Sequence, residues 1–309
     1  MFGKRSVACI IGLNDTNTLL NESEFSYGQK TQYTWIPYTI MFLFVLPLNT
    51  ILVYGFYKTS RPFSVITKLF ILLSVLDTCY SAGLVYQSIV ASDNSSLPCS
   101  VIFPSMASLI GIWTFGFLVL CSISFLRNLS IRRPLYQTSA KHVSYAVIVQ
   151  GLFGFLYGAV ITVIALAVQD MRLFNTVLLV TMSMQIVICC FILVTSILSY
   201  RGLQLSSGPV VDSDTKSPAV EHRNQRKAHA LKTLVLITGY YCLSTCPSII
   251  LNSTGLEILA TDWGLGLILA FTCLQLSNAG VNSLILILRT KKLREYFGIK
   301  RCCLWFAYS

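Results

Sequence analysis

Charged residues are scarce in this chain, and carboxylates are the scarcest of them. Asp, Glu, Lys and Arg together make up 11% of the sequence, about half the fraction that soluble domains carry. Asp77 is the only carboxylate within the long apolar segments, and no Cys and His residues have the spacing of a metal site. Because one buried carboxylate provides no acid–base pair, the sequence argues against an enzyme and predicts no cysteine–histidine metal centre.

Hydrophobic residues make up 54% of the chain and fall in long runs. A helix needs about 20 mostly apolar residues to cross a bilayer, and a helix satisfies its backbone hydrogen bonds within one segment. The sequence therefore predicts an all-α membrane protein, a seven-transmembrane helix bundle spanning residues 35–288. The predicted helices are residues 35–57, 66–90, 101–126, 143–168, 174–199, 231–253 and 264–288.

Lys and Arg are distributed unevenly around these segments. Of the 23 Lys and Arg residues, only Lys4, Arg5, Lys30 and Arg172 fall on the side of the N-terminus. Because basic loops stay in the cytoplasm, the tail 1–34 is expected to be extracellular and the tail 289–309 cytoplasmic, in a multi-pass protein of the plasma membrane. The net charge of +11 then reflects topology and attraction to anionic membrane lipid, and we expect no nucleic acid partner.

Candidate modification sites lie in the segments expected outside the membrane. Three Asn-x-Ser/Thr sequons are candidates for glycosylation, at Asn14, Asn21 and Asn94. Cys9 and Cys99 are the cysteines expected in the oxidising compartment. Two cysteines in such a compartment can form a disulfide, and the sequence leaves both the paired and the unpaired state open.

The stretch after the seventh segment has an amphipathic pattern. Leu293, Tyr296 and Phe297 share one helical face, with Lys and Arg around the rest. This pattern predicts a short amphipathic eighth helix lying in the membrane interface. Cys302 and Cys303 at its end are candidates for palmitoylation, since juxtamembrane cysteines near basic residues are typical acceptors.

Polar residues and prolines recur at motif positions within the apolar segments. A charge at mid-bilayer costs on the order of 3 kcal/mol unless it has partners, so Asp77 in LSVLDTCY is a candidate functional residue. The other motif residues are Asn49 in LPLNTILVY, Arg127 in SFLRNLSIRRPLYQ, Pro247 in CLSTCPSII, and Asn278 and Asn282 in SNAGVNSLILILR. With these residues the chain resembles the rhodopsin-like G-protein-coupled receptors over essentially its whole membrane region.

The chain also departs from the motifs of that family. Leu126 and Asn128 stand in place of the acid and the tyrosine of D-R-Y, and Thr245 in place of the tryptophan of C-W-x-P. Ser283 and Leu286 replace the proline and tyrosine of N-P-x-x-Y. These changes leave a non-coupling decoy or a chaperone-like seven-helix protein open beside a coupling receptor. A transporter or channel is less favoured, since the sequence has no internal repeat.

The resemblance implies four groups of site residues. A polar switch, and a possible sodium site, would contain Asp77, Asn49, Asn278 and Asn282. Coupling to a heterotrimeric G protein would use Arg127, Arg132, Arg133, Pro134, Leu135, Lys227 and Lys232. A hinge in the sixth helix would contain Pro247, Tyr241 and Thr245. A ligand pocket would be lined by Leu109, Trp113, Gln185 and Gln275.

Alternatives remain open for the polar group and for the ligand. Asp77 and the three asparagines are also compatible with a cluster that only holds helices together. Leu109 stands where amine receptors carry an aspartate, and Leu276 where opsins carry the retinal lysine. By this resemblance a peptide or lipid ligand is favoured over a monoamine, and retinal is excluded.

Overall fold

The structure is a computed structural model that describes residues 35–60, 62–92, 99–132, 139–168, 171–206, 218–253 and 262–299. Within these ranges the chain is all-helical and contains no strand, as predicted. The helices are α2 (Trp35–Ile40), the π-helix η2 (Met41–Val45), α3 (Leu46–Thr59), α4 (Val65–Ser92), α5 (Cys99–Arg132), α6 (Ala140–Val168), α7 (Met171–Ser206), α8 (Pro218–Ser253), α10 (Asp262–Arg289) and α11 (Lys291–Tyr296).

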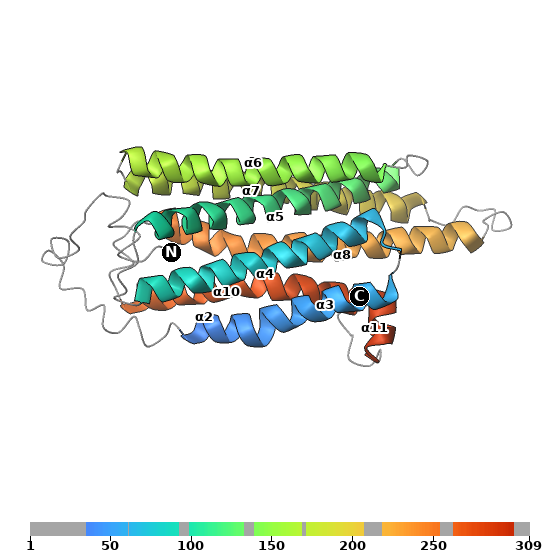
Figure 1. Cartoon of the computed structure of the whole chain (residues 1–309). Helices are drawn as coiled ribbons and strands as arrows, with labels where there is room; N and C mark the ends of the chain where they lie inside the picture. The colour runs from blue at the N-terminus through green and yellow to red at the C-terminus, as the bar shows by residue number, and fades with distance from the viewer. Residues whose placement is uncertain are drawn as a thin grey trace, which may run out of the picture.

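The long helices run side by side, and the short helix α11 lies across one end of the bundle (Figure 1). We call this end, where α3 and α10 finish and α8 begins, the α11 end. Helix α5 packs against α4 and α6, α7 packs against α8, and α10 packs against α3 and α8. Residues far apart in the sequence, in α3, α4, α8 and α10, are thereby brought together.

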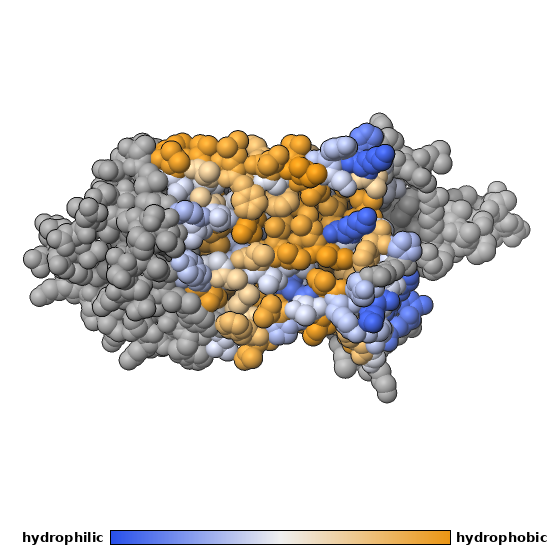
Figure 2. All heavy atoms as spheres, in the orientation of Figure 1, coloured by the Kyte–Doolittle hydropathy of each residue, from blue (hydrophilic) through white to orange (hydrophobic). Residues whose placement is uncertain are grey.

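Several helices have the length and composition of membrane spans. Within the described residues, five stretches are long and apolar enough to cross a bilayer: Met41–Thr59, Val65–Tyr86, Ala107–Ser130, Ala140–Ile164 and Leu179–Leu198. On the face shown in Figure 2, apolar side chains form a broad band over the middle of the bundle, and the most hydrophilic residues gather toward the α11 end. These long apolar helices suggest a membrane-embedded multi-pass protein.

The first membrane helix changes its winding just before a proline. Leu46 donates its backbone N–H to the carbonyl of Met41, five residues back, which makes Met41–Val45 a π-helix. Pro47 follows at the second position of α3 and has no N–H to donate. Local π-helical winding can satisfy backbone groups that a proline leaves free in a membrane helix, and here it lets the helix continue through Pro47.

Glycines allow α5 and α6 to approach backbone to backbone. A Cβ built on Gly158 would collide with the carbonyl oxygen of Ala107 and lie 2.8 Å from the backbone N of Gly111. A Cβ built on Gly154 would lie 2.9 Å from the carbonyl oxygen of Gly111. Small residues at such crossings let membrane helices gain close van der Waals packing, so this contact fixes the distance between α5 and α6.

Helix α11 folds back against α3, and its side chains differ from the predicted amphipathic pattern. Leu293 is fully buried against the bundle, near Gly55, while Tyr296 is 45% exposed. Arg294, expected on the polar rim, is only 9% exposed. The helix is short, and Gly298, two residues after its last residue, has a φ of 65°, a left-handed conformation that favours glycine. Leu293 and Arg294, which are neighbours in the sequence, are thus both buried, although one is apolar and the other is charged.

Candidate functional site

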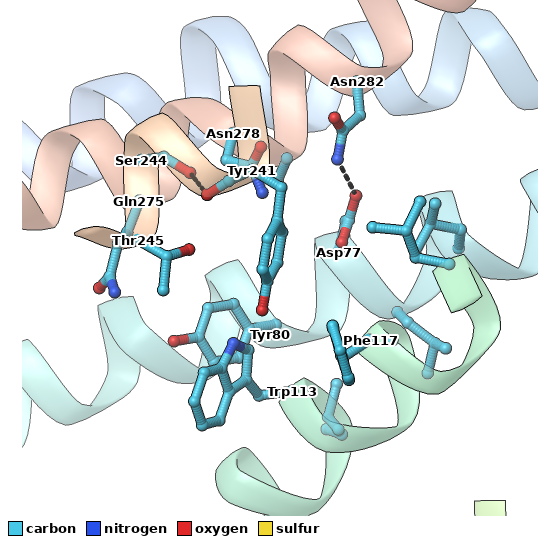
Figure 3. Close-up of a pocket in the computed structure, with 16 residues that line it drawn as sticks. Asp77, Tyr80, Trp113, Phe117, Tyr241, Ser244, Thr245, Gln275, Asn278 and Asn282 are labelled. Atoms are coloured by element: carbon cyan, nitrogen blue, oxygen red, sulfur yellow. Dashed lines mark hydrogen bonds between the residues drawn. The ribbon is translucent and has the colours of Figure 1, made fainter. Parts of the chain in front are cut away.

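A small cavity lies between four helices in the middle of the bundle (Figure 3). Its polar lining residues come from α4, α5, α8 and α10, and they are Asp77, Tyr80, Trp113, Tyr241, Ser244, Thr245, Gln275, Asn278 and Asn282. The cavity volume is about 50 Å³, whereas pockets for drug-sized ligands measure roughly 300–1,000 Å³. One buried water needs about 10–15 Å³ in the same measure. The cavity therefore suits a few waters or a small ion, not an organic ligand.

Asp77 faces this cavity from the middle of α4. Its Oδ2 accepts a hydrogen bond from Nδ2 of Asn282 in α10, at 3.4 Å (Figure 3). That distance is at the long limit for such a bond, so the carboxylate retains capacity for further donors or for a cation. Three buried amide oxygens in the same helix, α10, have no hydrogen-bond partner: Oε1 of Gln275, Oδ1 of Asn278 and Oδ1 of Asn282. The cavity wall thus combines a carboxylate with three amide oxygens that are free to accept a hydrogen bond or bind a cation.

Asn49, the fourth predicted member of the polar group, lies in a separate contact. Its Nδ2 donates to the carbonyl oxygens of Val45, at 2.9 Å, and Ala279, at 3.4 Å. Its Oδ1 accepts a bond from Oγ of Ser283, at 2.6 Å. Asn49 does not line the cavity that contains Asp77. The structure therefore brings Asp77, Asn278 and Asn282 together and assigns Asn49 to a bond between α3 and α10.

Replacing Ser283 with alanine should weaken this bond between α3 and α10. Oδ1 of Asn49 would lose its partner while buried, and we expect a loss of about 1 kcal/mol, seen as a lower thermal unfolding midpoint in detergent. Ser74 is a matched control, because it is equally buried but bonds only to Phe70 within α4. Equal midpoints for Ser283→Ala and Ser74→Ala would contradict a stabilising role for the contact between helices.

The residues predicted for the hinge and for the ligand pocket do not all lie in one site. Tyr241 and Thr245 line the cavity, and so do Trp113 and Gln275. Gln185 is buried in α7, where its Oε1 accepts a 3.0 Å bond from the Tyr241 hydroxyl. The side chain of Pro247, in α8, is outside the described part. These residues link α7 and α8 to the cavity wall but do not outline one ligand pocket.

Leu109 is also separate from the cavity. It packs in an apolar cluster with Leu84 and Leu276, at the level of Gly83. The sequence prediction of a single pocket lined by Leu109, Trp113, Gln185 and Gln275 assumed that inward-facing residues of α5, α7 and α10 share one space. The structure places apolar packing around Leu109 and a polar cavity beside Gln275 instead.

The α11 end holds those coupling candidates whose side chains are described. The guanidinium carbon of Arg127 in α5 lies 5.3 Å from the ring centre of Phe70. Lys232 Nζ in α8 lies 5.6 Å from the ring centre of Tyr200 in α7. Arg132 and Lys227 belong to α5 and α8, but their side chains are outside the described part. Arg133, Pro134 and Leu135 lie outside the described residues.

The predicted modification sites fall outside what the structure describes. These are Asn14, Asn21, Asn94, Cys9, Cys302 and Cys303. Cys99 begins α5, but its side chain is not among the described ones. Glycosylation, palmitoylation and the pairing of Cys9 with Cys99 all stay predictions.

No protein-family model matches this chain, and no curated protein matches it. Its class is given by its own fold: an all-helical protein, in the residues described, with several helices suited to crossing a membrane. The candidate site is a polar cavity inside that helix bundle.

Proposed function

We propose that the chain is a rhodopsin-like G-protein-coupled receptor. In this proposal, the seven apolar segments are transmembrane helices, the N-terminus is extracellular, and the α11 end faces the cytoplasm at the plasma membrane. An extracellular ligand would bind toward the opposite end, since the central cavity is too small for it. The absence of an aspartate at Leu109 favours a peptide or lipid ligand over a monoamine.

The observation that carries the proposal is the Asp77–Asn282 contact beside the cavity. A carboxylate from α4 and an amide from α10 meet at 3.4 Å, deep among otherwise apolar helices. Intramembrane carboxylates are costly and usually functional. Residues of α5 and α8 complete the cavity wall, so a shift of any of these helices changes the surroundings of Asp77. Such a cavity can link helix movement to the protonation or ion occupancy of one side chain.

The cavity chemistry also fits a sodium ion. Asp77, Asn278, Asn282 and Gln275 would hold it, because they supply one carboxylate and three buried amide oxygens with no other partner. Hard cations prefer oxygen ligands, and a single carboxylate balances one positive charge. A bound cation would compensate the charge of Asp77 and favour the helix arrangement that keeps these oxygens together.

Signal transfer to a heterotrimeric G protein would occur at the α11 end. Helix α8 extends from Pro218, well beyond the apolar segment that begins near residue 231, and its first turns include the basic stretch HRNQRK. Figure 1 shows this extension projecting past the neighbouring helices. Leu126 provides no carboxylate beside Arg127, so we expect a weak inactive-state lock and raised basal signalling.

Replacing Arg127 with alanine tests this function. We expect the unliganded wild-type protein to dissociate a heterotrimeric G protein above the level of empty vector, and Arg127→Ala to fall to that level at equal surface expression. Arg201→Ala is a matched control, because Arg201 is an exposed arginine near the C-terminal end of α7. Identical signals from wild type and Arg127→Ala would favour a non-coupling protein.

Two contacts of α10 favour the alternative, a decoy or chaperone-like protein that does not couple to a G protein. Leu286, which replaces the tyrosine of N-P-x-x-Y, is buried in the apolar core, and Ser283 bonds to Asn49 where the family has a proline. Both replacements stabilise one packing of α10. A decoy or chaperone-like protein would need only that one packing, whereas a coupling receptor needs two.

A further inference from the structure

Four basic residues, from α8, α10 and α11, lie close enough to influence one another. Arg289 ends α10, Arg294 lies in α11, and His229 and Lys232 lie one turn apart in α8. Nε2 of His229 donates to the carbonyl oxygen of Arg289 at 2.8 Å. Nε of Arg289 donates to Oγ1 of Thr233 at 3.4 Å. These bonds hold α8, at His229 and Thr233, against the end of α10.

Both arginines of this cluster are buried. Arg289 is 7% exposed and Arg294 is 9% exposed. Burial lowers the pKa of Arg289, and the nearby charge of Arg294 lowers it further. Burial also lowers the pKa of His229, and Arg289, Arg294 and Lys232 act in the same direction, against its backbone bond to Arg289. The groups are thus close enough to repel one another.

Arg294 in particular has no compensating carboxylate among the residues that the structure describes. Its buried Nε has no hydrogen-bond partner, although a buried charge is strongly destabilising unless it is paired and hydrogen-bonded. Among the described side chains, the carboxylates are Asp77, in the central cavity, and Glu295. Glu295 is exposed and pairs with the equally exposed Lys291 at 3.7 Å. A guanidinium with an unused donor, beside a second guanidinium, is an arrangement suited to an anion.

The surroundings favour an anion presented by the membrane. The α11 end is where the apolar band of the bundle gives way to hydrophilic side chains (Figure 2). Beside Arg294, Tyr296 lies 6.3 Å from Tyr54 between ring centres, and Lys58 Nζ lies 5.7 Å from the ring of Tyr54. Exposed tyrosines and lysines of this kind are typical of a membrane–water interface. The side chain of His229 is exposed overall, while the ring nitrogen bonded to Arg289 is partly buried, so the cluster reaches the surface on the α8 side.

We propose that Arg294, Arg289 and Lys232 form a binding site for a phosphate monoester on the headgroup of an anionic membrane lipid. Guanidinium groups bind phosphate oxygens through paired N–H donors, and Lys232 adds a point charge. The phosphate would accept the unused Nε–H of Arg294 and offset the repulsion among the basic groups. It would also connect α8, α10 and α11. The site does not depend on coupling to a G protein.

The test measures binding and thermal stability of the full-length protein in nanodiscs. Discs of phosphatidylcholine are compared with discs that also contain phosphatidylinositol bisphosphate, and inositol trisphosphate in solution forms a third arm. We expect the bisphosphate lipid to raise the unfolding midpoint of the wild type. Arg294→Gln should weaken lipid binding at least about tenfold, because it removes charge-assisted hydrogen bonds. Lys291→Gln, which removes the same charge from the exposed side of α11, should bind as the wild type does.

A second variant protects the test against misfolding. Lys232 is only partly buried, with its Nζ over the ring of Tyr200, and Lys232→Gln should fold normally and bind the lipid several-fold more weakly, as expected for loss of one positive charge near the site. Equal binding by wild type, Arg294→Gln and Lys232→Gln would overturn the site. Equal losses in Arg294→Gln and Lys291→Gln would reduce the effect to nonspecific charge. Saturable binding of inositol trisphosphate with no response to the lipid would overturn the membrane source.

Discussion

Gly158→Ala is expected to prevent the close packing of α5 and α6 although it adds a single methyl group. The new Cβ would collide with the carbonyl oxygen of Ala107 and press on the backbone of Gly111. A flexible side chain could turn away, but a helix backbone cannot, so relief requires the two helices to separate. Overpacking costs typically 1–3 kcal/mol, occasionally more, and here we expect roughly 3 kcal/mol or more. The measurement is the thermal midpoint of detergent-solubilised protein together with surface expression.

Gly239→Ala is the matched control for this substitution. Gly239 also lies inside a long helix, α8, but no atom lies within 4 Å of a Cβ built on it. Alanine is favoured over glycine in helices by roughly 1 kcal/mol, so this variant should be as stable as the wild type or more so. A wild-type midpoint for Gly158→Ala would mean that α5 and α6 do not approach as closely as the structure indicates.

The contrast between Gly158 and Gly239 shows what the sequence leaves undetermined. Apolar runs predicted where the helices lie, because run length reflects bilayer thickness. They do not reveal which glycine faces a neighbouring backbone, since that depends on the rotation of each helix. The apolar run starting near residue 231 is also shorter than α8, which begins at Pro218. Hydrophobicity marks the membrane, whereas the helix continues through polar residues that still form backbone bonds.

The sequence likewise predicts part of the candidate site but not all of its contacts. The register of Asp77 and Asn282 placed both inside the bundle, and they do meet. In the sequence Ser283 marks only the absence of the motif proline, whereas in the structure it bonds to Asn49. No local pattern distinguishes these outcomes, because the partner of Asn49 is set by how α3 crosses α10. Arg294 was expected at the surface, since the turn at Thr290 that buries it has no strong signal in the sequence.

Asp77→Asn is expected to abolish the response of the protein to sodium. The wild type should unfold at a higher temperature in sodium chloride than in choline chloride of equal ionic strength, because sodium would bind only the folded cavity. Sodium at ten times its Kd would stabilise the fold by about 1.4 kcal/mol. Asparagine has nearly the same shape and still accepts the bond from Asn282, but it cannot balance a cation. The midpoint of Asp77→Asn should therefore be the same in both salts.

Basal signalling gives a second measurement on the same variant. If sodium favours the inactive arrangement of α4, α5, α8 and α10, Asp77→Asn should signal more in the absence of ligand, and removing sodium should raise the wild-type signal toward the same level. Ser81→Ala is the control, because Ser81 is a buried polar residue of α4 that does not line the cavity. It should keep the wild-type response to sodium. A sodium response that persists in Asp77→Asn would exclude Asp77 as the cation site, while unchanged stability and signalling in both salts would make it a residue that only packs helices.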